Sequence, residues 1–355
     1  MNEDRTELEM TYEGEEFAKQ IPITDYREYA IEDNMPDVIF IHNPYDDTNR
    51  VTSLPEKYFS RELKKYTNHL VYVPYKVCSG DVKDIYCMTP GVQNAWRVFV
   101  QSERVRKTYI KYQNPDKIVV TGSPKIDAVI ESIKNPPELP LAWKRALRGK
   151  KVFLLNTHLN PLINDGEKAI EEIRHLMKIF ESRYDAAILW RPHPLSIETI
   201  KSMNPGILKD YQMVISEFER LENGIYDDSN SPHLALAVAD GYIGNWSSLV
   251  TMFGITGKPV YIRNIALQES KRNKMDLMSE KGVQQLENAA KDQRLQTVYL
   301  EKNVEPEMFI DAIVAGIDPL KKYRKNEFQE IVFEADEKAG ELIWKNVWQD
   351  LWQDE

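Results

Sequence analysis

Short apolar runs alternate with helix-like segments along most of this chain, and this alternation constrains the fold more than any other feature. The run Val38–Ile41 and the segments 70–75, 97–102 and 117–124 are apolar and stop abruptly at Pro, Ser, Gly or Asn. A continuous apolar run is typical of a strand buried on both faces, as in a parallel sheet. The segments between the runs, such as RELKKYT and ERVRKTYIKY, have helical patterns. The alternation predicts a mainly parallel α/β sheet.

A second alternating set follows residues 131–150, which are rich in proline and charge and form our candidate linker. We expect a helix at 166–183 and strands at 151–156, 186–190, 212–215, 241–244 and 259–262. A chain of 355 residues usually forms more than one domain. We therefore predict two doubly wound Rossmann-type domains, residues 1–140 and 141–335, which face a central cleft, and a C-terminal helix at 336–355.

Composition excludes several classes of protein. The formal net charge of −10 argues against a protein that coats nucleic acid, so we expect no nucleic-acid partner. Cys78 and Cys87 are the only cysteines, which is typical of a reduced, cytoplasmic setting without a disulfide framework. The sequence has no run of about 18 apolar residues and no signal-peptide pattern. We therefore expect a cytoplasmic protein, with at most surface contact to a membrane.

Polar residues that follow the expected strands are the candidate site residues, because ligands of open α/β sheets bind at the carboxyl ends of the strands. These residues are His42, Asn43, Tyr45 and Asp46 after the first strand, Thr157 and His158, Arg191 and His193, and Asn245, Ser247 and Ser248. No Gly-rich phosphate loop is present. We also see no spacing typical of metal ligands and expect no tightly bound metal or cofactor.

The segment WRPHP has two interpretations. Pro192 and Pro194 stiffen the backbone, so Arg191 and His193 project from a fixed segment and suit a pyrophosphate. Alternatively, the arginine is paired with a carboxylate elsewhere in the fold.

Ser247 also has two interpretations. A serine between a strand and a helix can bring an anion to the helix start, or it can simply cap the helix. His233 lies in the first turn of another expected helix, after Ser231 and Pro232, where a ligand contact and a surface position are both open.

The ordered set of motifs resembles the CDP-glycerol glycerophosphotransferase family, whose members build teichoic-acid-like glycerol-phosphate polymers of the cell wall and related capsule polysaccharides. The resemblance covers most of the chain. It rests on PDVIFIHNPYD, SRELKKYTNHLVYVPY and VVTGSPKID, and on WRPHP and DSNSPHLALAVADGYIGNWSSLVTMFGITGKPVYI.

The resemblance implies a GT-B-like fold with an N-terminal acceptor-side domain and a C-terminal donor domain that binds CDP-glycerol. It implies transfer of glycerol phosphate, or a related polyol phosphate, to an acceptor hydroxyl with release of CMP. The acceptor would be a polyol phosphate or a lipid-linked glycan, which places the protein at the inner face of the membrane. The implied donor contacts are Arg191, His193, His233, Asn245, Ser247 and Ser248; the acceptor-side candidates are Asn43, Tyr45, Asp46 and Lys125; the catalytic candidates are His42, His158 and His193.

The sequence also departs from the family pattern. Asn245-Trp246 stands where many members have Asp-Tyr, and the acceptor-domain motif His-Gly-Thr-Pro is absent. One interpretation of the late first strand is that the N-terminal domain lacks its first β-α unit. Two alternative functions therefore stay open: a GT-B glycosyltransferase that uses a UDP- or GDP-sugar, and a catalytically inactive nucleotide-binding relative.

The C-terminal helix has an aromatic face. Trp344, Trp348 and Trp352 are spaced four residues apart. This face could contact a membrane surface or a partner, or the helix could pack onto the body of the protein, which is the interpretation we favour. Asp350, Asp354 and Glu355 would be repelled by anionic lipids.

Overall fold

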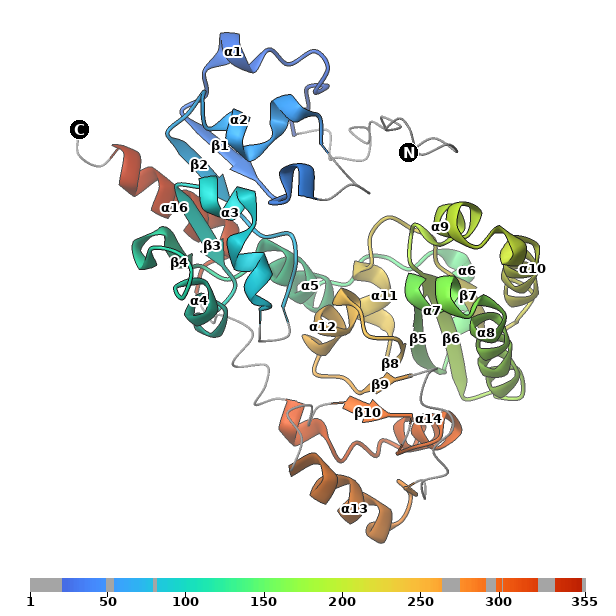
Figure 1. Cartoon of the computed structure of the whole chain (residues 1–355). Helices are drawn as coiled ribbons and strands as arrows, with labels where there is room; N and C mark the ends of the chain where they lie inside the picture. Colours follow the sequence, from blue (N-terminus) through green and yellow to red (C-terminus); the bar gives the residue numbers. More distant parts are fainter. Residues whose placement is uncertain are drawn as a thin grey trace. The chain divides into compact units, whose positions relative to one another are not determined.

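The computed structural model describes residues 21–48, 54–78, 82–263, 275–291, 298–301, 303–324 and 336–352. The chain divides into two compact units (Figure 1). Unit 1 comprises Met1–Ser123 and Phe333–Glu355, and unit 2 comprises Pro124–Val332.

Unit 1 contains a sheet of four parallel strands in the consecutive order β1-β2-β3-β4. The strands are β1 (Val38–Ile41), β2 (His69–Tyr72), β3 (Arg97–Val100) and β4 (Ile118–Val120); the helices are α1 (Ile31–Asn34), α2 (Ser60–Leu63), α3 (Pro90–Asn94), α4 (Glu103–Tyr109) and α16 (Ala339–Trp352); the 3₁₀ turns are Asp46–Thr48, Glu56–Tyr58, Asp84–Met88 and Pro115–Lys117. Because consecutive parallel strands all progress in one direction, right-handed connections place their helices on a single face. In this part of the chain, the helices that connect consecutive strands therefore lie on one face of the sheet.

Helix α16 covers the other face of this sheet. Ile343 and Val347 are buried in one cluster with Val71 of β2 and Phe99 of β3. Arg97 at the start of β3 forms an ion pair with Asp350 on the helix, at 2.8 Å. The C-terminal helix therefore packs within unit 1, in agreement with the favoured interpretation that it packs onto the body of the protein.

The tryptophans of α16 form a separate stripe on its outer side. Trp344 and Trp348 are 49% and 47% exposed, and the ring centroids of Trp348 and Trp352 lie 4.6 Å apart. The helix thus packs through its aliphatic face, while two of the indoles are about half exposed.

Unit 2 contains a sheet of six parallel strands in the order β10-β9-β8-β5-β6-β7. The strands are β5 (Lys151–Thr157), β6 (Ala186–Pro192), β7 (Gly224–Tyr226), β8 (Gly241–Gly244), β9 (Val260–Ile262) and β10 (Val298–Leu300); the helices are α5 (Pro124–Lys134), α6 (Leu141–Leu147), α7 (Leu159–Asn164), α8 (Gly166–Glu181), α9 (Ser196–Met203), α10 (Leu208–Phe218), α11 (His233–Val238), α12 (Ser248–Gly254), α13 (Glu280–Lys291) and α14 (Pro306–Val314); a 3₁₀ turn spans Pro205–Ile207. The order reverses between β5 and β8, so this sheet is doubly wound, as expected.

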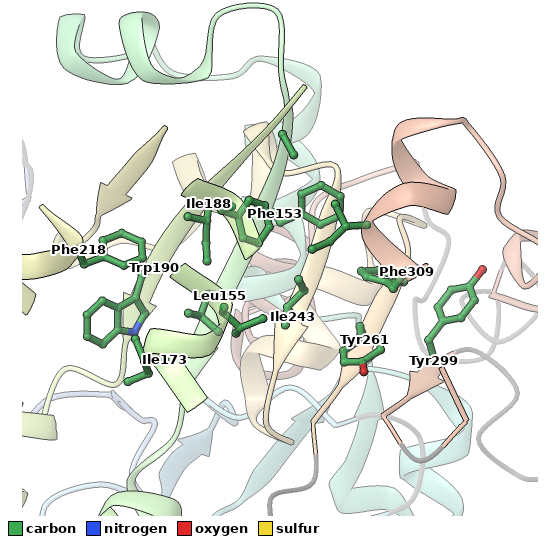
Figure 2. Packing of buried hydrophobic residues seen from close by; sticks show 14 of the residues in the cluster. Phe153, Leu155, Ile173, Ile188, Trp190, Phe218, Ile243, Tyr261, Tyr299 and Phe309 are labelled. Carbon is green, nitrogen blue, oxygen red and sulfur yellow. The ribbon is translucent and has the colours of Figure 1, made fainter. Parts of the chain in front are cut away.

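The two faces of this sheet are buried in separate cores, because successive residues of a strand point to opposite sides. On one face, Phe153 and Ile188 pack with side chains such as Phe218 and Phe309 (Figure 2). On the other face, Leu154 and Leu189 pack with residues of α5, α11 and α12. Burial on both faces explains the continuous apolar runs in the sequence.

Several elements differ from the sequence-based expectations. Residues 212–215 (QMVI), expected as a strand, lie within α10, whose buried face is formed by Tyr211, Val214 and Phe218. This spacing of three and four residues is helical, and it extends beyond the short run that suggests a strand. Strands β7 and β10, of three residues each, were not predicted.

The division between the units lies at residues 123 and 124, whereas the sequence places it at 140 and 141. Leu147 of α6 and Val129 of α5 are buried in one cluster with Ala235 and Leu236 of α11, which ties the proline-rich region to unit 2. Among the described residues, no helix combines the length and apolarity needed to cross a membrane.

Candidate functional site

The carboxyl ends of β5 and β8 meet at the point where the strand order of unit 2 reverses, which is the usual ligand-binding position in such sheets. A pocket lies at this edge. Its lining includes Asn156, Thr157 and His158 after β5, Gly244 and Asn245 at the end of β8, and Arg263 after β9. The structure thus brings together residues from three strand ends.

The imidazole rings of His158 and His193 lie next to each other at this edge. The ring centroids of His158 and His193 are 5.8 Å apart, with the rings nearly perpendicular. The backbone N–H of His193 donates to the carbonyl oxygen of Thr157 at 3.0 Å, which fixes the segment after β6 against the end of β5. The hydroxyl of Ser196 donates to the carbonyl oxygen of His193 at 2.7 Å and closes the turn.

Each imidazole accepts a backbone hydrogen bond at Nδ1. The Nδ1 atom of His158 accepts from the N–H of Asn160 at 3.4 Å, and that of His193 accepts from the N–H of Leu195 at 3.1 Å. Burial lowers the pKa of His158, and burial together with the neighbouring His158 lowers the pKa of His193. These contacts assign both rings to the neutral tautomer that carries its proton on Nε2, so each can donate one hydrogen bond to a ligand.

Ser247 and Ser248, in the segment after β8, have different environments. The Ser247 hydroxyl donates to Oδ1 of Asn156 at 3.0 Å and accepts the N–H of Leu249 at 3.2 Å, so it caps α12. This matches the structural alternative considered for Ser247. Ser248, by contrast, is exposed. Asn245 lies against the β5 end, where its Oδ1 accepts the N–H of His158 at 3.4 Å.

Arg191 is buried in an ion pair. Its Nη1 donates to Oδ2 of Asp227 at 2.7 Å and to the Ser229 hydroxyl at 3.0 Å, and its Nη2 donates to the Ser229 carbonyl oxygen at 2.5 Å. The residue is only 5% exposed. This is the arrangement of the second interpretation of WRPHP, a charge paired with a carboxylate. The guanidinium pins the segment between β7 and α11 to the end of β6.

His233 begins α11, and its N–H donates to the Ser231 hydroxyl at 3.4 Å. Burial and the positive charges of Lys125 and Arg191 lower its pKa. Lys125 lies in the first turn of α5, within unit 2, where burial lowers the pKa of its ammonium group. The acceptor-side candidate Lys125 therefore belongs to the same unit as the donor-side candidates.

The other acceptor-side candidates lie in unit 1 after β1. Asp46 is 4% exposed and accepts hydrogen bonds from the N–H and hydroxyl of Ser60, both at 2.8 Å, so its carboxylate is occupied within this unit. The Asn43 Oδ1 accepts the N–H of Tyr45 at 3.1 Å, and burial is the main cause that raises the pKa of Tyr45.

His42 is exposed, and its ring packs edge-on against Tyr75 at 6.4 Å. Of the candidates after β1, its imidazole is thus the one that stays at the surface.

The sequence reasoning missed four residues of this edge. Asn156 and Tyr242 lie inside strands and Glu172 lies on helix α8, so none of the three follows a strand as the other candidates do. Arg263 directly follows β9, an expected strand, and the same rule could have found it. Arg263 is buried and forms ion pairs with Glu172 and with Glu301. The sequence held one signal for Asn156, which is a polar residue in the otherwise apolar run VFLLN. In the folded sheet Asn156 pairs with Gly244, next to Asn245.

Among the described residues, no three His, Cys, Asp or Glu side chains form a group that could hold a metal ion. The chemistry that this part of unit 2 offers is hydrogen-bond donation from the two neutral imidazoles, with the exposed Ser248 hydroxyl on the neighbouring segment.

Comparisons with known proteins identify the fold. No protein-family model and no curated protein matches the chain. Solved structures do match. A UDP-N-acetylglucosamine 2-epimerase from Listeria monocytogenes matches with a TM-score of 0.54 and 14% identity, over 92% of this chain and 76% of that chain.

Two further structures are similar to the chain. The S. aureus MnaA-UDP structure has a TM-score of 0.55 and 15% identity, over 90% of this chain and 78% of that chain. The UDP-GlcNAc 2-epimerase of Methanocaldococcus jannaschii, in complex with UDP-GlcNAc and UDP, has a TM-score of 0.53 and 17% identity, over 89% and 77%. The chain therefore has a GT-B-like fold of two α/β domains with parallel sheets, as predicted. Identities this low establish the fold alone.

Proposed function

We propose that the chain is a transferase whose unit 2 binds a nucleoside diphosphate donor at the β5/β8 edge. In this proposal the donor is CDP-glycerol or a related CDP-polyol, and the product nucleotide is CMP. The motifs that resemble CDP-glycerol glycerophosphotransferases support the donor class. The observation that carries the proposal is the facing pair His158 and His193, 5.8 Å apart at the switch point of the sheet.

The chemistry of this pair suits a diphosphate. A neutral Nε2–H can donate to a phosphate oxygen, and two such donors fixed by backbone contacts need little reorganisation as charge builds on the departing nucleotide. An acceptor hydroxyl oxygen attacks the phosphorus next to glycerol, the bond from that phosphorus to the bridging oxygen breaks, and CMP departs with that oxygen. The hydroxyl proton passes to a base.

The tautomers of His158 and His193 decide whether either residue can be the base that accepts the proton of the acceptor hydroxyl. His158 carries its proton on Nε2 and so acts as a donor toward a ligand, whereas a base needs a free nitrogen there. We therefore assign His158 and His193 to the departing phosphate and keep His42 as the acceptor-side base. Arg191 takes a positioning role, because its Nη1 and Nη2 groups already bind Asp227 and Ser229.

Calorimetric titration with CDP, UDP and GDP tests this function without an acceptor. We expect selective binding of CDP, weakened about tenfold or more when His193 or His158 is changed to Gln. His175→Gln is the matched control, since His175 is exposed in the middle of α8. Equal losses in all three variants, or no binding of any nucleotide at millimolar concentration, would contradict the proposal.

A UDP-sugar enzyme is the second candidate function. The similar structures from S. aureus and M. jannaschii were solved with UDP, so a uridine nucleotide is a reasonable alternative ligand. A clear preference for UDP over CDP in the same titration would favour this candidate. Release of CMP from CDP-glycerol, followed over time with a polyol-phosphate acceptor, would favour the first.

A further inference from the structure

Asn156 connects three strand ends through one side chain. Its Nδ2 donates to the carbonyl oxygen of Arg191 on β6 at 2.9 Å. Its Oδ1 accepts hydrogen bonds from the hydroxyls of Tyr242 and Ser247, both at 3.0 Å. The residue is 7% exposed. A buried amide with this many partners is costly to replace, because each partner would lose its hydrogen bond.

The orientation of this amide follows from its neighbours. The Arg191 carbonyl oxygen can only accept, so the amide nitrogen must face it. The backbone oxygen of Asn156 also accepts the N–H of Asn245 at 3.4 Å. The Tyr242 hydroxyl lies 3.1 Å from the Asn245 carbonyl oxygen and so reaches the same turn.

These contacts reach the two segments that carry candidate ligand groups. Residues 191–193 lead to the His193 imidazole, and residues 245–248 lead to the exposed Ser248. We infer that Asn156 is a positioning residue, which holds these two segments in register so that they can bind the diphosphate of a nucleotide together. The inference rests on the proposed function for the identity of the ligand.

Asn156→Asp isolates this role, because the two side chains have nearly the same shape. The new carboxylate places an oxygen against the Arg191 carbonyl oxygen, which repels it, and adds a buried negative charge near an anion site. Burial raises the pKa of such a carboxyl group. When it is protonated, its O–H can donate to the Arg191 carbonyl oxygen and restore the connection.

The test compares CDP affinity at pH 8 and pH 6 in the full-length chain. At pH 8 we expect Asn156→Asp to bind CDP at least tenfold more weakly than the unmodified chain. At pH 6 the difference between the two proteins should shrink to threefold or less. Comparison at equal pH removes the effect of histidine protonation, which both proteins share.

Asn223→Asp is the matched control. Asn223 is also buried, and its Nδ2 donates to the carbonyl oxygens of Phe180, Arg183 and Ala186, but it lies at the amino end of the sheet. We expect this variant to bind CDP as the unmodified chain does. Equal weakening by both variants, or an Asn156→Asp affinity within twofold of the unmodified chain at pH 8, would overturn the inference.

Amide spectra of the ligand-free protein give a second readout. Asn156→Asp should shift the amides of His193 and Asn245 at pH 8 and restore them at pH 6, while Asn223→Asp leaves both unchanged. Tyr242→Phe, which keeps the buried ring, should shift Asn245 but not His193. If the unmodified chain binds no CDP, UDP or GDP, the proposed function fails, yet these shifts still decide the inference. Unmoved amides in Asn156→Asp would contradict it even if CDP binds.

Discussion

At the scale of single residues, the site depends on which hydrogen-bonding atoms are already used. Ser247 and Arg191 have the residue types expected of phosphate ligands, yet their polar groups are bound within unit 2. His158 and His193 use Nδ1 for backbone contacts, and the proposed function assigns their Nε2 atoms to a ligand. Sequence spacing identifies these four positions but does not separate ligands from supports, because that depends on partners such as Asp227, distant in sequence.

The two histidines predict a loss of stability in acid. Their lowered pKa values mean that the folded state resists protonation, so the unfolded state binds more protons as the pH falls. Their contribution to the free energy of unfolding is complete above the ordinary histidine pKa of about 6.5. It declines as the pH falls from there through the lower pKa values that the two histidines have in the folded state. Urea unfolding at pH 7.5 and 5.5 should show this decline, reduced in the double variant His158→Gln/His193→Gln. An unchanged decline in that variant would contradict the assignment.

Arg191→Ala should destabilise unit 2 strongly. Removal of one partner leaves the buried carboxylate of Asp227 without its charge partner, which typically costs about 3–5 kcal/mol. Denaturant unfolding would measure the loss, with Arg174→Ala as the control because its ion pair with Glu217 is partly exposed. A loss below about 1 kcal/mol for Arg191→Ala would be inconsistent with the structural role assigned here.

At the scale of elements, local patterns predicted most strands and the long helix α8. Runs such as KVFLLN and AAILW become β5 and β6 because they are buried on both faces. Patterns missed the three-residue strand β7, and they failed where the short run QMVI belonged to a longer helical face, as in α10. Packing of α16 onto the body of the protein was the favoured interpretation, but its partner strands lie more than 200 residues away in the sequence and could not be named.

Gly244 is required for the close pairing of β5 and β8. A Cβ atom at this position would lie 2.3 Å from the backbone oxygen of Asn156, which cannot move aside without separating the strands. We expect Gly244→Ala to cost about 1–3 kcal/mol of unfolding free energy and to weaken CDP binding. Gly206→Ala is the control, since nothing lies within 4 Å of the position that a Cβ atom would take there. Equal effects of the two substitutions on thermal unfolding would rule out this explanation.

Helix α16 should stabilise unit 1 through its aliphatic face. Ile343→Ala removes a buried side chain and should cost about 2–5 kcal/mol. Hydrogen exchange should then rise in β2 and β3 of unit 1 and stay unchanged in β5 and β6. Trp344→Ala, at an exposed position, should have a smaller effect. Increased exchange in unit 2 alone would contradict the assignment of this helix.

At the scale of the whole molecule, the fold is more general than the function. A GT-B-like arrangement of two α/β domains serves many reactions, so the donor must be argued from the site. The sequence predicted the fold class and the carboxyl edges of the strands, because both follow from hydrophobic patterning. It could not reveal the roles of Asn156 or Tyr242, since their importance arises from contacts between strands that are adjacent only in the folded sheet.

The most direct test of the donor site is to follow the imidazole nitrogens by NMR during titration with CDP. Nitrogen-15 spectra of the ligand-free protein should show His158 and His193 as neutral rings protonated at Nε2. On addition of CDP, both Nε2–H signals should shift saturably with one dissociation constant, while His175 on the surface of α8 stays unchanged. Shifts confined to other histidines, or protonation of these rings at Nδ1, would contradict the account.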